Sequence, residues 1–125
     1  MDKERKKLKV LVVEDENLVR EALSSMLEQK GFISEEARNG KEVLAKVVKD
    51  MPDIIILDLM MPVMNGSETY SKLKENPKTR DIPIIICSAL PISDFKKDNI
   101  EVEGYLEKPF SIRELCEKIN EVLGL

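Results

Sequence analysis

Ile54-Ile-Ile-Leu-Asp-Leu-Met-Met-Pro-Val-Met-Asn-Gly66 decides the fold of this chain, because it places a carboxylate, Asp58, at the end of a strongly apolar run. A short apolar run bounded by turn residues is typical of a strand buried in a parallel sheet. Other apolar runs end in the same way: residues 10–13 are followed by Glu14 and Asp15, residues 82–87 by Ser88 and residues 102–107 by Lys108. The carboxyl ends of parallel strands meet at one edge of an open sheet, where ligands bind. We therefore expect all five side chains to converge.

The size and charge of the chain limit the classes of protein to which it can belong. Its 125 residues, 42% of them apolar, suit one domain over 1–125 that begins with a charged tail at 1–7. The formal net charge of -4 is spread along the chain, which provides no basic stripe for nucleic acid and favours a protein partner. No apolar run is long enough to span a membrane, so we expect a cytoplasmic protein.

Strand and helix patterns alternate along the chain. Five strand-helix units follow one another without a linker or repeat, which predicts an α/β fold with a parallel sheet wrapped by helices. The first helix is expected over residues 16–30, with Gly31 as its left-handed C-terminal cap. Its apolar residues recur at helical spacing: Leu18, Val19, Ala22, Leu23, Met26 and Leu27.

Turn and capping residues bound the other helices. Residues 39–40 lead into a second helix that ends before Pro52, because the residue preceding proline resists helical angles. A third helix is expected from Gly66 to the Asn-Pro pair at 76–77.

The last helix has the clearest start signal. Ser111 and Glu114 have the spacing of a capping box. Before it, residues 91–101 are dominated by charge, and a helix there is expected to be short.

The acids at the sheet edge predict a metal site. Three neighbouring carboxylates, Glu14, Asp15 and Asp58, would raise one another's pKa, and a divalent cation relieves that repulsion. The chain has no histidine, and its two cysteines, Cys87 and Cys116, lack the spacing of a zinc site and are interpreted as reduced core thiols. Oxygen ligands favour Mg²⁺, with Mn²⁺ as a substitute.

The same residues predict phosphoryl chemistry. Magnesium held by one or two carboxylates usually keeps water and phosphate ligands. Lys108 supplies a positive charge and Ser88 a hydroxyl donor to phosphoryl oxygens, which is the electrostatic stabilisation that phosphoryl transfer requires. Asp58 remains as the nucleophile and forms an aspartyl phosphate. A histidine phosphodonor has to be another protein, because this chain contains no histidine.

Each residue also has a structural explanation when it is taken alone. Asp15 precedes a helix and could be only its N-cap. Ser88 could be a turn residue, Lys108 a solvated strand end and Tyr105 an ordinary edge-strand aromatic. The occurrence of the whole set at strand ends favours the functional interpretation.

Four motifs occur in order along the chain: the acidic pair at 14–15, the loop at 58–66 with Met61-Pro62, the Ser-Ala pair at 88–89 and the Lys-Pro-Phe triplet at 108–110. In these motifs the chain resembles the CheY-like receiver domains of the response regulators of two-component signalling, over essentially its whole length. The resemblance implies a flavodoxin-like, doubly wound (βα)5 fold with a five-stranded parallel sheet in the order 2-1-3-4-5. It also implies a cis bond between Lys108 and Pro109.

The resemblance further implies who donates the phosphate and what holds the metal. Asp58 would accept a phosphoryl group from a sensor histidine kinase or a histidine phosphotransfer protein. Asp15, Asp58 and the backbone carbonyl of Met60 would bind Mg²⁺, and Glu14 would act mostly through a water molecule.

A switch at the sheet edge is implied in the same way. Ser88 would turn toward the phosphoryl group, Lys108 would pair with it, and Tyr105 would swing inward. These movements would alter the face formed by the helix expected in 91–101, the fifth strand and the last helix. The chain would then be a signalling switch with a downstream protein target, not an enzyme that releases a product.

Two departures from the family pattern bear on this interpretation. Fewer residues separate Ser88 from Lys108 than we expect, and the loss falls within 91–101, so the output surface is expected to be unusual. Met60 and Leu90 stand two positions after Asp58 and Ser88, where a polar side chain could orient an attacking water. Because both are apolar, we predict slow self-dephosphorylation.

Competing functions fit the residues less well. A degenerate receiver that binds its partner constitutively is disfavoured, because every phosphorylation residue is present. A phosphatase with an aspartyl-phosphate intermediate predicts an acid where Met60 stands, and a flavin carrier needs a phosphate-binding loop where residues 14–15 would repel phosphate. From the length we expect a stand-alone regulator that docks to a protein or relays phosphate onward. We expect a monomer before phosphorylation and leave open a dimer afterwards.

Overall fold

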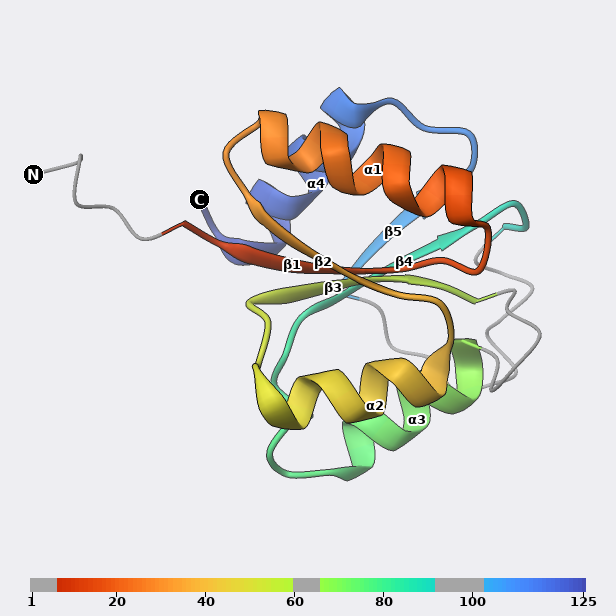
Figure 1. Cartoon of the computed structure of the whole chain (residues 1–125), viewed down its shortest axis with the longest axis vertical. Coiled ribbons are helices and arrows are strands. Elements are labelled where there is room, and N and C mark those ends of the chain that lie inside the picture. The colour runs from red at the N-terminus through yellow and green to blue at the C-terminus, as the bar shows by residue number, and fades with distance from the viewer. Residues whose placement is uncertain (1–6, 60–65, 92–102) are drawn as a thin grey trace, which may run out of the picture.

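The computed structural model describes residues 7–59, 66–91 and 103–125, which form alternating strands and helices (Figure 1). The strands are β1 (Lys9–Val13), β2 (Ile33–Ala37), β3 (Ile54–Asp58), β4 (Ile84–Ser88) and β5 (Gly104–Glu107). The helices in these ranges are α1 (Asn17–Gln29), α2 (Gly40–Lys49), α3 (Gly66–Glu75) and α4 (Ile112–Leu123).

The five strands form one parallel sheet in the order β2-β1-β3-β4-β5. Helices α1 and α4 lie against one face of the sheet, and α2 and α3 lie against the other (Figure 1). This arrangement confirms the predicted doubly wound fold and its strand order. The short helix expected in 91–101 falls almost wholly on residues 92–102, outside the described part of the chain.

The core has two halves because side chains alternate between the faces of a strand. Leu11 and Val13 of β1 join the cluster under α2 and α3, whereas Val10 and Val12 join the cluster under α1 and α4. All five residues of the central strand β3 are buried. A strand covered on both faces has no solvent side, which is why residues 54–57 are uniformly apolar.

Most of the expected helix signals are present. Asn39 caps α2 by accepting a hydrogen bond from the Glu42 N–H at 3.0 Å, and Ser111 and Glu114 form the predicted capping box of α4. Gly31 follows α1 with φ of 97°, a left-handed conformation that glycine adopts without strain. The bond between Lys108 and Pro109 is cis, as expected.

One part of the helix pattern was misleading. Leu18 is 83% exposed and Val19 is 38% exposed, although both fit the apolar spacing of α1. The buried face of α1 instead contains Arg20, Ser24 and Leu27, which follow one another at helical spacing. Leu18 therefore lies off the face that contacts the sheet.

A close approach of backbone to backbone fixes the start of α3. A Cβ atom added at Gly66 would lie 2.6 Å from the carbonyl oxygen of Asp58 and would also collide with the Cα of Leu59. The Gly66 N–H donates to the Leu59 carbonyl at 3.1 Å. The missing side chain of Gly66 thus lets α3 begin directly against the end of β3, where Asp58 lies.

We predict that Gly66→Ala destabilises the protein more than Gly104→Ala does. At Gly104 the added Cβ would meet side-chain atoms of Val122, Ile85 and Lys118, which can adjust, whereas at Gly66 it would meet backbone. Overpacking typically costs about 1–3 kcal/mol, and we expect Gly66→Ala at the upper end. Urea denaturation of both variants measures the difference, and equal losses would contradict the explanation.

Candidate functional site

The alternation of side chains brings three charged groups to the same side of the sheet edge. Glu14 continues the row of Val10 and Val12, and Asp58 continues the row of Ile54 and Ile56, both facing α1 and α4. Lys108, two positions after Leu106 on β5, continues a third row of the same parity. The sequence spacing therefore directs these groups to one place, although they lie up to 94 positions apart.

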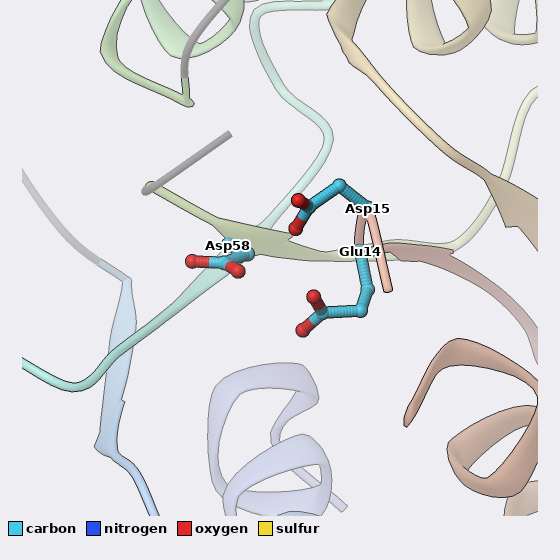
Figure 2. Close-up of side chains that lie close together, drawn as sticks. All are labelled: Glu14, Asp15 and Asp58. Atoms are coloured by element: carbon cyan, nitrogen blue, oxygen red, sulfur yellow. The ribbon is translucent and has the colours of Figure 1, made fainter. Parts of the chain in front are cut away.

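Three carboxylates converge at this edge, as predicted. Oxygen atoms of Glu14, Asp15 and Asp58 lie within 4.8 Å of one another, and the side chains of Glu14 and Asp15 extend toward the side on which Asp58 lies (Figure 2). Glu14 is 3% exposed and Asp58 is 5% exposed, while Asp15 is the more open of the three. Buried ionised carboxylates are unfavourable unless a positive charge lies beside them.

Lys108 supplies that charge. Its Nζ lies 2.7 Å from Oε1 of Glu14 and 3.2 Å from Oδ2 of Asp58, so one ammonium group joins the ends of three strands. Burial lowers the pKa of Lys108, but the hydrogen bond to Glu14 and the charges of Asp58 and Glu14 outweigh it. The pKa therefore lies above its ordinary value, and Lys108 is a cation at every physiological pH. Lys108 is therefore a paired cation, although its side chain keeps 29% of its exposure.

Asp15 has an unfavourable environment for its charge. Burial raises its pKa, and a hydrogen bond with the Glu14 carboxyl raises it further, against the opposing effect of a hydrogen bond from its own backbone N–H. The helix cap provides no alternative role, because the N-cap of α1 is Glu16 and not Asp15. Asp15 therefore belongs to the acidic cluster.

Ser88 and Tyr105 are connected through Leu90. The hydroxyl oxygen of Ser88, which is fully buried, accepts a hydrogen bond from the Leu90 N–H at 3.1 Å. The carbonyl oxygen of Leu90 accepts a hydrogen bond from the Tyr105 hydroxyl. The Ser88 carbonyl accepts from the Lys108 N–H at 2.8 Å, so the same residue also holds the start of the loop that carries the lysine. Ser88 thus combines the turn role with a place at the sheet edge.

Met60 and Arg20 are the two remaining residues that bear on the site. Met60, predicted to offer its carbonyl to the metal, lies outside the described residues. Arg20 was not singled out from the sequence, yet it is 6% exposed and donates to the Glu14 carbonyl oxygen at 3.0 Å. The sequence signal for Arg20 was weak: a charged residue at helical spacing from Ser24 and Leu27, in a helix that follows the acidic pair.

The cluster has the composition of a hard-cation site. Three carboxylates and the Lys108 ammonium leave a formal charge of -2, which a divalent cation would neutralise. Carboxylate oxygens suit Mg²⁺ or Mn²⁺, and the neighbouring lysine and serine offer donors to a phosphoryl group. The residues present therefore fit a magnesium ion with a phosphate ligand.

The fold and the acidic cluster together define a doubly wound α/β domain with a candidate divalent-cation site at the carboxyl edge of its sheet. Residues 10–120 match the family model described as the response regulator receiver domain, and the chain belongs to that family. Receiver domains are switches of two-component signalling that accept phosphate, and response regulators interact with histidine kinases.

Relatives and solved structures agree with this assignment. The chain is 40% identical over 116 residues to the phosphate regulon transcriptional regulatory protein PhoB of Pseudomonas aeruginosa, covering 91% of this chain and 51% of PhoB. It is 34% identical to histidine kinase P4 of Formosa agariphila, covering 96% of this chain but 9% of the kinase. The structure of the Vibrio cholerae chemotaxis protein CheY4 superposes with a TM-score of 0.87 at 31% identity, covering 94% of this chain and 99% of CheY4.

The relatives and the solved structure differ in length from one another. The chain spans about half the length of the PhoB relatives that it matches, and almost the whole of CheY4. Within the described residues, no helix is both long enough and apolar enough to cross a membrane.

We predict that Asp15→Asn stabilises the protein when divalent cations are removed by a chelator at pH 7. The pKa of Asp15 is raised in the folded state from its ordinary value of 3.8. At a pH above 3.8, ionisation of Asp15 therefore opposes folding. The advantage of the variant should shrink as the pH falls toward 3.8, because Asp15 then becomes protonated in both the folded and unfolded states. Urea denaturation across this pH range is the measurement. A variant less stable than wild type at pH 7 would contradict the prediction.

Proposed function

We propose that this chain is a phosphorylation-controlled switch in which Asp58 accepts a phosphoryl group from a phosphohistidine of another protein. In this transfer the P–N bond to the donor histidine breaks and a P–O bond to an Asp58 carboxylate oxygen forms. The observation that carries the proposal is the contact of Lys108 with both Glu14 and Asp58, because it places a cation beside the acceptor and one further acid. Asp15 adds a third carboxylate to the same cluster. A sensor histidine kinase or a histidine phosphotransfer protein is the proposed donor.

The residues have distinct proposed tasks. Glu14, Asp15 and Asp58, with the carbonyl of Met60, would hold Mg²⁺, which neutralises charge on the transferring phosphoryl group when it is bound. Lys108 is already beside Asp58 and would move its ammonium onto a phosphoryl oxygen. Ser88 would exchange its hydrogen bond from Leu90 for donation to a second phosphoryl oxygen. The backbone at these strand ends is held by packing, so the proposed changes are confined to the two side chains.

The proposed output is a change in protein binding. If Ser88 turns toward the phosphoryl group, its hydrogen bond from the Leu90 N–H is lost, and the Leu90 carbonyl that holds the Tyr105 hydroxyl is free to shift. Tyr105 would then move inward and change the face that includes β5 and α4. We propose that a downstream protein, or a second phosphotransfer protein, reads this face.

The stand-alone status expected from the length is also a proposal. The near-complete overlap with CheY4 supports it, and the half coverage of the PhoB relatives supports the alternative of a longer regulator. The intact mass of the protein purified from its natural source distinguishes the two.

We predict that wild type gains one phosphate-sized increment in intact mass when incubated with Mg²⁺ and acetyl phosphate, and that Asp58→Ala gains none. Asp81→Ala is the matched control, because Asp81 is an exposed aspartate outside the acidic cluster, and it should gain the same increment as wild type. A gain in Asp58→Ala would place the acceptor elsewhere. No gain in a wild type that binds Mg²⁺ would indicate strict dependence on a kinase, whereas no gain and no Mg²⁺ binding would favour a constitutive binding module.

We predict that the phosphorylated protein loses its phosphate slowly, because Met60 and Leu90 offer no polar group to orient water. Leu90→Gln should accelerate the loss several-fold, because this variant supplies a polar group that orients an attacking water, while Leu90→Ala should not. Phosphate release from purified phosphoprotein measures the three rates. A half-life of seconds for wild type would refute slow dephosphorylation, and equal acceleration by Gln and Ala would assign the effect to access instead of polarity.

A further inference from the structure

Arg20 is a buried charge whose contacts converge on the acidic loop. Its Nη1 donates to the Glu14 carbonyl oxygen at 3.0 Å, its Nε to the Glu36 carboxylate at 3.0 Å and its Nη2 to the Asn17 amide oxygen at 2.7 Å. The side chain therefore joins helix α1, strand β2 and the residue that follows β1. A guanidinium group can serve three acceptors at once, because its donors form a rigid planar fork.

The bond to Glu14 fixes more than one residue. The carbonyl of Glu14 and the N–H of Asp15 belong to the same planar peptide group, so a bond to this oxygen sets the orientation of that plane. On its other side, the Glu14 N–H donates to the Ala37 carbonyl at 3.1 Å. Hydrogen bonds thus hold the backbone between β1 and α1 on both sides of Glu14. They also fix the orientation of the peptide group from which the Asp15 backbone continues.

We propose that Arg20 is a positioning residue that sets the geometry of the Glu14 and Asp15 carboxylates for Mg²⁺. This inference rests on the metal site of the proposed function. Arg20 acts through the backbone of the loop, because its hydrogen bonds go to the Glu14 carbonyl, to Glu36 and to Asn17 and not to the three carboxylates of the cluster. Partners that orient metal ligands typically contribute 10- to 100-fold in metal affinity.

The sign of the effect separates positioning from charge. Removal of a positive charge near three carboxylates should strengthen cation binding if long-range electrostatics alone mattered. Loss of the bond to the Glu14 carbonyl should weaken it. A fall in Mg²⁺ affinity after neutralisation of Arg20 therefore has the opposite direction from the electrostatic effect.

Ser24 provides a matched control. It lies one helical turn after Arg20 on the same buried face of α1, and its Oγ lies 2.6 Å from Oγ of Ser34 on β2. Ser24→Ala thus removes a polar link between α1 and β2 without touching the acidic loop. Its loss should lower stability and leave Mg²⁺ binding unchanged.

The test is a calorimetric titration with Mg²⁺ alone of wild type, Arg20→Gln, Arg20→Lys and Ser24→Ala, at a temperature where each variant is folded by circular dichroism. We expect about 10- to 100-fold weaker binding for Arg20→Gln. Arg20→Lys keeps the charge but cannot span three acceptors, so we expect weaker binding here too. If Arg20→Gln does not fold, the comparison of Arg20→Lys with wild type provides the test. At saturating Mg²⁺ the rate of phosphorylation by acetyl phosphate should return toward that of wild type.

The outcomes distinguish this inference from the function on which it rests. If wild type does not bind Mg²⁺, the proposed metal site is wrong. If wild type binds and the folded Arg20 variants bind equally well, the positioning role is wrong and the proposed function stands. Equal weakening in Ser24→Ala would also overturn the positioning role, because general loosening of α1 would then explain the loss.

Discussion

The ion pairs of Lys108 with Glu14 and Asp58 are the interaction on which the site depends. Two nearly buried carboxylates and a third beside them could not be kept together in an apolar sheet edge without a cation. Lys108 meets this need only in part, since one positive charge faces three acids. The remaining negative charge favours a further cation, and it is the physical basis of the proposed Mg²⁺ site.

The charged cluster is possible because side chains alternate between the two faces of each strand. Glu14, Asp58 and Lys108 each continue a row of apolar side chains under α1 and α4, so the register of a parallel sheet is enough to direct them to one place. Ser88 continues the opposite row, that of Ile84 and Ile86. Its hydroxyl is therefore placed on the side that leads through Leu90 to Tyr105. The two faces of the sheet thus separate the group that neutralises charge from the group that is linked to the surface.

The sequence was most informative where a pattern has one structural solution. Uniformly apolar residues at 54–57 are typical of a strand buried on both faces, and the structure confirms that burial. Ser111 and Glu114 have the spacing of a capping box, and the structure confirms it. Leu18 was misleading because apolar spacing does not reveal which stripe of an amphipathic helix faces the sheet. Arg20 escaped notice for a related reason: a buried arginine depends on three acceptors from separate elements, and such a tertiary arrangement has no local signature. The cis bond before Pro109 was expected only through the family resemblance.

Arg20 adds a second cation to the site, with a different task from that of Lys108. Lys108 neutralises the carboxylates directly, whereas Arg20 holds the backbone from which two of them project. Because Arg20 is also paired with Glu36, its own charge is largely balanced within β2 and adds little repulsion toward an incoming cation. Arg20 can therefore hold the acidic loop without reducing the negative charge available to the proposed Mg²⁺ ion. A lysine at position 20 would bring the same charge without the fork of donors, so the division of labour between the two cations follows from the geometry of their side chains.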